Sequence, residues 1–200
     1  MNQEINKETI KELMENPGKC IGEVIRSTFE CIKKTKGQEA LNKFEEEMKN
    51  LGYPIDSKTI KPFEWYPVGL RALNFIALRR AFAWKDKDFE KFGEDLLDYS
   101  FVFKMLLKFI LSFEDLFNQS SKYWRKHFTI GELETYQFNE KEKYGILRIH
   151  NFKVHLDFCP LLLGYFKKLG KLSGKKNVII KETKCMFKGD PYHEYTINWD

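Results

Sequence analysis

The spacing of apolar residues changes once along the chain, close to residue 130, and this change limits the folds that the sequence can adopt. Before it, apolar residues recur at three- and four-residue steps, the period of an α-helix, as in the run Ile21, Val24, Ile25, Phe29 and Ile32. After it, short runs rich in β-branched and aromatic residues alternate with turn-forming residues, which is typical of β-strands. The sequence therefore predicts a helical first part followed by a part that contains a sheet.

Glycine, proline and serine residues divide the first part into separate helices. Gly37 breaks the helix to which that run belongs, and the next helix ends at Gly52. Pro67 opens a further helix, because its missing amide hydrogen costs little in the first turn. Ser112 stands three residues before an aspartate, as in a weak form of the capping box, and we expect the helix that it starts to end near Phe128.

The second part contains four expected strands in two pairs. The first pair covers 132–140 and 144–150, and the second covers 176–187 and 192–199, around the turn-forming sequence at 188–191. A helix over 158–172 separates the pairs. Strands that are segregated from helices indicate an antiparallel sheet. We therefore expect an α+β fold in which an N-terminal helical layer packs on a C-terminal antiparallel sheet, in the order helices, two strands, helix, two strands.

Length, charge and apolar windows restrict the class of protein. A chain of 200 residues fits one domain better than two small ones, so we expect a single domain over 1–200. The net charge of +5 is spread over interleaved lysine and glutamate residues, so no nucleic-acid partner is expected. The most apolar window, 101–113, is too short to span a membrane and is expected to be a buried helix. The N-terminus lacks a signal-peptide pattern, which favours a cytoplasmic protein with reduced cysteines.

Three segments near the C-terminus resemble a known family. In Phe158–Tyr165 a cysteine opens a helix, in Glu182–Cys185 a strand carries a glutamate and a cysteine, and in Gly189–Tyr195 a Gly-Asp turn precedes the last strand. This ordered set is similar to the C-terminal pattern of four-vinyl-reductase (4-vinyl reductase) domains. The segment Tyr123–Phe128, with the Gly-Glu-Leu-Glu sequence that follows at 131–134, resembles the helix-to-sheet junction of a related bacterial group. The resemblance covers roughly residues 60 to 200, and it implies a ligand-binding core over 61–200 with 1–60 as an N-terminal helical extension.

The resemblance implies a fold shared with heme-nitric-oxide sensors and with TRAPP vesicle-tethering subunits. It implies a non-catalytic sensor domain for an apolar or aromatic small molecule. Two alternatives are an accessory factor or reductase acting on a vinyl tetrapyrrole, and a protein-interaction subunit of TRAPP-like fold. The chain has no Gly-x-Gly-x-x-Gly fingerprint and no evident flavin motif, so neither a nucleotide nor a flavin is expected and an enzyme is not the favoured class.

The resemblance also implies a structural zinc ion held by Cys159, Glu182, Cys185 and His193, with the histidine where the family has a cysteine. Histidine is a common zinc ligand, so this replacement keeps the chemistry. Glu182 lies three residues before Cys185, and a regular strand would point the two to opposite faces, so a β-bulge is required. The alternatives are that the cysteines are small buried apolar residues and His193 a surface residue, or that Cys185 and His193 form a catalytic pair.

A ligand pocket is expected between the sheet and the helices of residues 66–125. Its candidate lining residues are aromatic, and each of them is equally interpretable as core: Trp65, Tyr66, Phe75, Phe103, Phe109 and Trp124. A heme is not expected, although His127, His150 and His155 are present, because no Tyr-x-Ser-x-Arg element for the propionates is found.

A homodimer is expected for two reasons. The resemblance implies one that forms through the helices. In addition, two helical segments, 70–78 and 101–113, carry apolar residues on more than one face and therefore require burial on all sides. The competing interpretation is that the first two helices, over residues 6–34, cover this layer within one chain.

Overall fold

The computed structural model describes residues 6–100 and 112–200 of the chain. The chain forms two compact units, Met1–Lys85 and Asp86–Asp200, named below the N-terminal and the C-terminal unit. Helices and antiparallel sheets occur together, so the predicted α+β class is confirmed. The expected division into an extension over 1–60 and a core over 61–200 stays a prediction.

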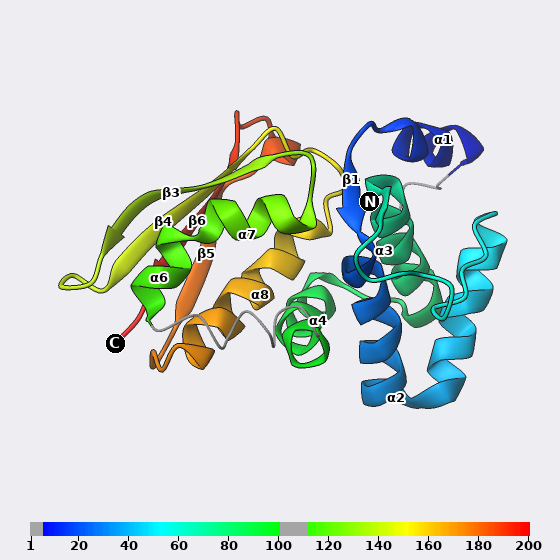
Figure 1. Ribbon diagram of the computed structural model, residues 1–200, viewed down its shortest axis with the longest axis horizontal. Helices are drawn as coiled ribbons and strands as arrows, with labels where there is room; N and C mark the ends of the chain where they lie inside the picture. Colours follow the sequence, from blue (N-terminus) through cyan, green and yellow to red (C-terminus); the bar gives the residue numbers. More distant parts are fainter. Residues whose placement is uncertain (1–5, 101–111) are drawn as a thin grey trace. The chain divides into compact units, whose positions relative to one another are not determined.

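The N-terminal unit is mainly helical (Figure 1). Its elements are α1 (Lys7–Glu15), β1 (Lys19–Ile21), α2 (Gly22–Asn50), β2 (Trp65–Pro67) and α3 (Val68–Phe82). Gly37 has a φ of 86° and kinks α2 in the middle, because this left-handed backbone conformation interrupts a right-handed helix. The break predicted at Gly37 is therefore confirmed. The two-stranded antiparallel sheet of β1 and β2 was not predicted.

Helix α3 is buried over most of its circumference. Leu73, Phe75, Ile76 and Leu78 are all buried within one chain. The same helix also buries two polar side chains, Arg71 and Asn74. Because α3 is covered in a single chain, its apolar residues no longer call for a partner subunit. The other segment that suggested a homodimer, 101–113, lies outside the described residues except for its last two positions.

The C-terminal unit is built on a four-stranded antiparallel sheet of order β3-β4-β6-β5. Its strands are β3 (Glu132–Asn139), β4 (Tyr144–His150), β5 (Ile179–Lys184) and β6 (His193–Asn198), and a short 3₁₀ turn, η1 (Met186–Lys188), links the last two. Its helices are α4 (Asp86–Tyr99), α6 (Phe113–Asn118), α7 (Ser120–His127) and α8 (Phe158–Leu172). Helices α6 and α7 contact β3, and α8 contacts β5 (Figure 1).

The predicted order of helices, two strands, a helix and two strands is confirmed, but the single helix expected from Ser112 to near Phe128 is two helices, α6 and α7, interrupted at Gln119. Helix α8 has the predicted bounds, and Ser112 caps α6 by accepting a hydrogen bond from the Asp115 amide at 3.0 Å. The last pair of strands is shorter than predicted, because residues 185–191 form the turn that joins them. In the described part of the chain, no helix is both long and apolar enough to cross a membrane.

Helices α4 and α8 cross at very close range. A Cβ atom on Gly164 would collide with the backbone carbonyl of Glu90, and one on Gly93 would collide with that of Leu161. Ion pairs flank the crossing, including Lys171 to Glu94 at 2.9 Å. The glycines therefore bring the two backbones together, and this contact holds α8, whose first turn carries Cys159, in a defined position.

Candidate metal centre

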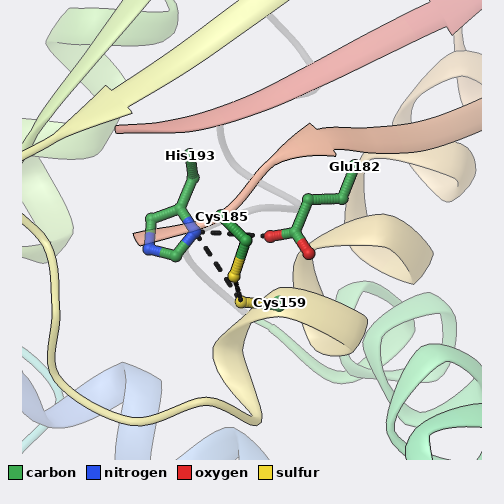
Figure 2. Close-up of side chains that lie close together, drawn as sticks. All are labelled: Cys159, Glu182, Cys185 and His193. Atoms are coloured by element: carbon green, nitrogen blue, oxygen red, sulfur yellow. Dashed lines mark hydrogen bonds and ion pairs between the residues drawn. The ribbon is translucent and has the colours of Figure 1, made fainter. Parts of the chain in front are cut away.

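Four side chains with metal-binding atoms meet in the C-terminal unit. One ligand atom each from Cys159, Glu182, Cys185 and His193 lies within 4.8 Å of all the others. Figure 2 shows the two sulfur atoms, the imidazole ring and the carboxylate pointing toward one another. Cys159, Cys185 and His193 are buried, and Glu182 is partly buried. The structure therefore brings together all four residues that the resemblance implied as metal ligands.

The ligands come from three pieces of secondary structure. Cys159 lies in the first turn of α8, and His193 is the first residue of β6. Cys185 directly follows β5, where its amide donates a hydrogen bond to the Asp190 carboxylate at 2.8 Å. Gly189 has a φ of 99°, which lets the chain return to β6 within a short turn. A bound ion would thus tie α8 to the β5–β6 hairpin.

A β-bulge places Glu182 on the same side as Cys185. The pairing of β5 with β6 matches Glu182 with Tyr195 and Lys184 with Glu194, so two steps along β5 correspond to one step along β6. The extra residue is Thr183, whose hydroxyl donates a hydrogen bond to the Glu194 carboxylate at 3.0 Å. The three-residue spacing of Glu182 and Cys185 required a β-bulge if both were to face one ion, and the structure contains this bulge. Glu182 can therefore point to the same side as Cys185.

The distances between the ligand atoms suit a tetrahedral ion. Metal–ligand bonds of about 2.0–2.3 Å in a tetrahedron place neighbouring ligand atoms roughly 3.3–3.8 Å apart. The sulfur atoms of Cys159 and Cys185 are 3.6 Å apart, and the Cys159 sulfur is 3.7 Å from His193 Nδ1. His193 Nδ1 is 3.3 Å from Glu182 Oε1. These three of the six separations match a tetrahedral ion, and the other three are within 4.8 Å.

The imidazole of His193 is oriented by a backbone carbonyl. His193 Nε2 lies 3.2 Å from the Phe152 carbonyl oxygen, which only accepts hydrogen bonds, so Nε2 carries a proton. When the ring carries both protons, Nδ1 donates to Glu182 Oε1 at 3.3 Å; when the Nδ1 proton is lost, a lone pair faces Glu182 and Cys159 and is available to a metal ion. Metal-bound histidines are held in the same way, with the second nitrogen donating to a carbonyl or a carboxylate.

Burial and neighbouring charges shift the pKa values of two cluster residues in opposite directions. Burial raises the pKa of the Cys159 thiol, and the adjacent Glu182 carboxylate and Cys185 raise it further. Burial would also raise the pKa of Glu182, but hydrogen bonds from His193 and Cys159 outweigh it and hold this pKa below its usual value. The carboxylate is therefore ionised, whereas Cys159 needs a strong positive charge, such as a metal ion, to become a thiolate.

The same contacts argue against a catalytic cysteine–histidine relay. A relay requires the thiol on one imidazole nitrogen and an orienting carboxylate on the other. Here Glu182 and Cys159 both face Nδ1, and Nε2 is engaged by the Phe152 carbonyl. The contacts of His193 do not have this order, and the four converging donors could hold a metal ion.

The six predicted pocket residues are distributed over both units. Trp65 is 44% exposed on β2, the Tyr66 hydroxyl accepts a hydrogen bond from the Lys61 amide at 3.0 Å, and Phe75 is buried in α3. Trp124 is buried in the C-terminal unit, where its ring is tilted against that of Phe128 at 4.7 Å and meets that of Phe152 edge-on at 4.8 Å. Phe103 and Phe109 lie outside the described residues. Their role as a ligand pocket stays a prediction.

Three residues that support the cluster were not predicted. The Tyr195 hydroxyl lies 3.4 Å from Glu182 Oε1, Asp190 accepts from the Cys185 amide, and Phe152 offers its carbonyl to His193. Tyr195 is detectable from the sequence in principle, because it lies two residues after His193 and so faces the same side of β6. The other two depend on the turn and the loop that carry them, and no sequence pattern indicates their positions.

Comparison with known proteins relates the fold to heme-nitric oxide/oxygen (H-NOX) domains. No family model matches the chain, and no curated protein matches it. An H-NOX protein from S. oneidensis in the Fe(II)NO ligation state is 12% identical, with a TM-score of 0.69 over 90% of this chain and 99% of the other. An oxygen-binding H-NOX domain related to soluble guanylate cyclases is 10% identical, with a TM-score of 0.63 over 90% of this chain and 94% of the other. At this identity the comparison establishes the fold alone.

The relationship to heme-nitric-oxide sensors that the resemblance implied is thus confirmed at the level of fold, whereas membership of the four-vinyl-reductase family is not shown.

The prediction that no heme is bound needs correction. It excluded heme because no propionate motif was found, yet the structural neighbours are H-NOX domains, and one comes from work on heme redox potential and porphyrin distortion. These structural neighbours do not support the prediction that this chain binds zinc. A missing short motif was therefore insufficient ground for excluding heme.

The four-ligand cluster itself does not fit a heme. A porphyrin fills the equatorial positions of its iron, which then needs a single axial ligand on an open face. Four side-chain donors that converge within 4.8 Å instead surround a small bare ion. A heme would therefore need an axial ligand elsewhere in the chain.

Proposed function

We propose that this chain is a non-catalytic, ligand-sensing domain of H-NOX-like fold, in which Cys159, Glu182, Cys185 and His193 bind one divalent transition-metal ion. The observation that carries the proposal is the convergence of two sulfur atoms, one imidazole nitrogen and one carboxylate oxygen at tetrahedral separations. Sulfur and imidazole donors select late transition-metal ions over magnesium or calcium. The role of the ion is structural, because all four positions around it are taken by protein and none is open for a substrate.

Cobalt titration tests this site directly. Addition of Co²⁺ to metal-free protein should give the absorption bands of a tetrahedral ion together with thiolate-to-metal charge transfer, and the titration should end at about one ion per chain. Cys159→Ser should remove most of the charge-transfer intensity. Cys31→Ser, a change at a buried cysteine outside the cluster, serves as the matched control and should leave the spectrum unchanged. Bands typical of octahedral cobalt, or equal spectra in both variants, would contradict the proposal.

The sensed ligand of this proposed domain is an apolar or aromatic small molecule. Support comes from the share of aromatic residues, 16% of the chain, because ligand pockets are lined mainly by apolar and aromatic side chains. Native mass spectrometry of the purified protein checks the idea, since a retained organic ligand adds a defined mass to the chain. A chain that carries no organic ligand and binds none from an aromatic library would count against it.

Heme is a second candidate ligand, and one histidine favours it. His127 Nδ1 lies 2.8 Å from the Tyr123 carbonyl oxygen and must donate to it, which leaves the lone pair on Nε2. Burial lowers the pKa of His127, so the ring is neutral at pH 7 and able to bind iron. Hemin addition to the purified protein should then give a Soret band of a histidine-bound heme, and His127→Ala should abolish it while His150→Ala should not. Identical hemin spectra in both variants would remove His127 from this role.

The homodimer expected from the sequence remains a proposal. Because α3 is buried in one chain, the interface would have to use other surfaces, and exposed apolar side chains of the C-terminal unit include Leu156, Leu172 and Ile179. Light scattering at micromolar concentration distinguishes a dimer from a monomer near 24 kDa, the chain mass being 23.9 kDa. A monomer would remove the dimer from the account and leave the metal centre untouched.

A further inference from the structure

The N-terminal unit contains a buried positive charge. Arg71, on α3, is 1% exposed. Its Nη1 donates a hydrogen bond to the Thr28 hydroxyl on α2, and its guanidinium lies 4.6 Å from the centre of the Phe75 ring. Within residues 6–100 and 112–200, Arg71 forms no ion pair with a carboxylate. A buried charge without a counter-charge is strongly destabilising, so the guanidinium calls for an anion.

Two polar atoms of α3 side chains also lack hydrogen-bond partners within the described part of the chain. They are Arg71 Nε, a donor, and Asn74 Oδ1, an acceptor, and both are buried. Asn74 is 0% exposed, and its Nδ2 contacts the Met48 sulfur at 3.6 Å, which fixes the direction of the amide oxygen. Residues three apart on a helix are neighbours on one face. Buried polar atoms without partners are rare in native proteins, and a bound water molecule or ion is a common explanation for them.

The nearby thiol of Cys20 does not supply the missing negative charge. Burial raises the pKa of Cys20 to about 12, so this cysteine is a neutral thiol at pH 7. Burial also lowers the pKa of Arg71 to about 10, which still leaves the guanidinium protonated at that pH. Arg71 and Cys20 together therefore carry a net positive charge.

We propose that Arg71 and Asn74 form a buried binding site for one small monovalent oxyanion that carries its own hydroxyl group, the class to which bicarbonate belongs. An oxygen of such an anion accepts the Arg71 Nε hydrogen bond and neutralises the guanidinium, whose planar donors suit planar oxyanions. The hydroxyl of the same anion donates to Asn74 Oδ1. Nitrate has the same charge and a similar planar shape but no hydroxyl, so it satisfies Arg71 alone. This site belongs to the N-terminal unit and shares no residue with the metal centre.

Thermal unfolding with different anions tests the proposal at fixed pH and ionic strength, with gluconate as the bulky reference anion. Bicarbonate above its dissociation constant should raise the Tm of the wild-type protein by roughly 3–5 °C for each tenfold increase in concentration. Nitrate should give a smaller rise, because Asn74 stays without a donor. No effect of either anion relative to gluconate would overturn the proposal, since the two polar atoms would then hold an ordered water molecule only.

Two variants separate the roles of the side chains. Arg71→Met keeps the length of the side chain and removes the buried charge, which does not destabilise a well-packed interior, so this variant should fold and lose both anion effects. Asn74→Leu should keep the nitrate effect and lose the extra effect of bicarbonate. A bicarbonate effect of equal size in Arg71→Met and the wild type would contradict the site. Metal content is measured in parallel and should not change in either variant, so failure here is distinct from failure of the metal centre.

Discussion

Tyr195 and Glu182 face each other across the β5–β6 ladder, and the Tyr195 hydroxyl donates a hydrogen bond to Glu182 Oε1 at 3.4 Å. The same oxygen lies 3.3 Å from His193 Nδ1. Tyr195 is fully buried, and its ring packs edge-on against Phe166 of α8 at 5.3 Å. A rigid, buried hydroxyl therefore fixes the direction in which the Glu182 carboxylate presents its oxygen to the cluster.

The first prediction concerns this hydroxyl. Tyr195→Phe should weaken Zn²⁺ or Co²⁺ binding by roughly tenfold, because partners that orient metal ligands typically account for 10–100-fold in affinity. It should also shift the cobalt absorption bands, since the carboxylate is then free to turn. Competition with a chromophoric chelator measures the affinity. Tyr144→Phe removes a hydroxyl that contacts Gln137 on the adjacent strand and should change neither readout. Equal affinities and spectra for both variants would show that Tyr195 is only part of the core.

The second prediction concerns the crossing of α4 and α8. Gly164→Ala should lower the free energy of unfolding by about 2–3 kcal/mol, because the added methyl group collides with the Glu90 carbonyl and forces the helices apart. Urea denaturation measures the loss. Leu172→Ala, at a position on the same helix that is 44% exposed, should cost much less. A Gly164→Ala protein as stable as the wild type would mean that the two helices are not in such close contact.

The third prediction concerns pH and the Glu94 ion pairs. Burial would raise the pKa of Glu94, but hydrogen bonds from Lys171 and Lys167 outweigh it and lower this pKa. A carboxyl group with a lowered pKa stabilises the fold above its unfolded pKa and loses this contribution as the pH falls through its folded pKa. Glu94→Gln should thus be less stable than the wild type at pH 7, by up to about 1 kcal/mol, and equally stable near pH 3.

Urea unfolding of both proteins at the two pH values checks this prediction. Glu39→Gln serves as the control, because Glu39 is 87% exposed in its pair with Lys43, and it should change little at either pH. A difference between Glu94→Gln and the wild type that persists unchanged at pH 3 would rule out ion pairing as its cause.

Much of the fold was predictable because it depends on local patterns. The helix over 158–172, the strands β3 and β4 and the cap at Ser112 follow from apolar period, capping residues and turn residues. The β1–β2 sheet was not predictable, since its three-residue strands are too short to show a period and pair across more than forty residues.

The metal cluster was predictable only in part. Its four residues were named by resemblance, but spacing alone placed Glu182 and Cys185 on opposite faces, and only the bulge at Thr183 brings them together. A bulge is set by tertiary contacts such as that of Thr183 with Glu194, which no local pattern encodes. For the same reason, neither the buried charge of Arg71 nor its missing partner was visible in the sequence.

The central claim is that the chain binds a metal ion through Cys159, Glu182, Cys185 and His193, and elemental analysis of the purified protein tests it most directly. We predict about one transition-metal ion per chain, and removal of the ion with a chelator should lower the Tm, because metal binding is coupled to folding. Cys185→Ser should purify with much less metal, and Cys20→Ser, at a buried cysteine of the N-terminal unit, should retain it. A folded wild-type protein that is metal-free, takes up neither Zn²⁺ nor Co²⁺, and keeps its Tm with chelator would contradict the account.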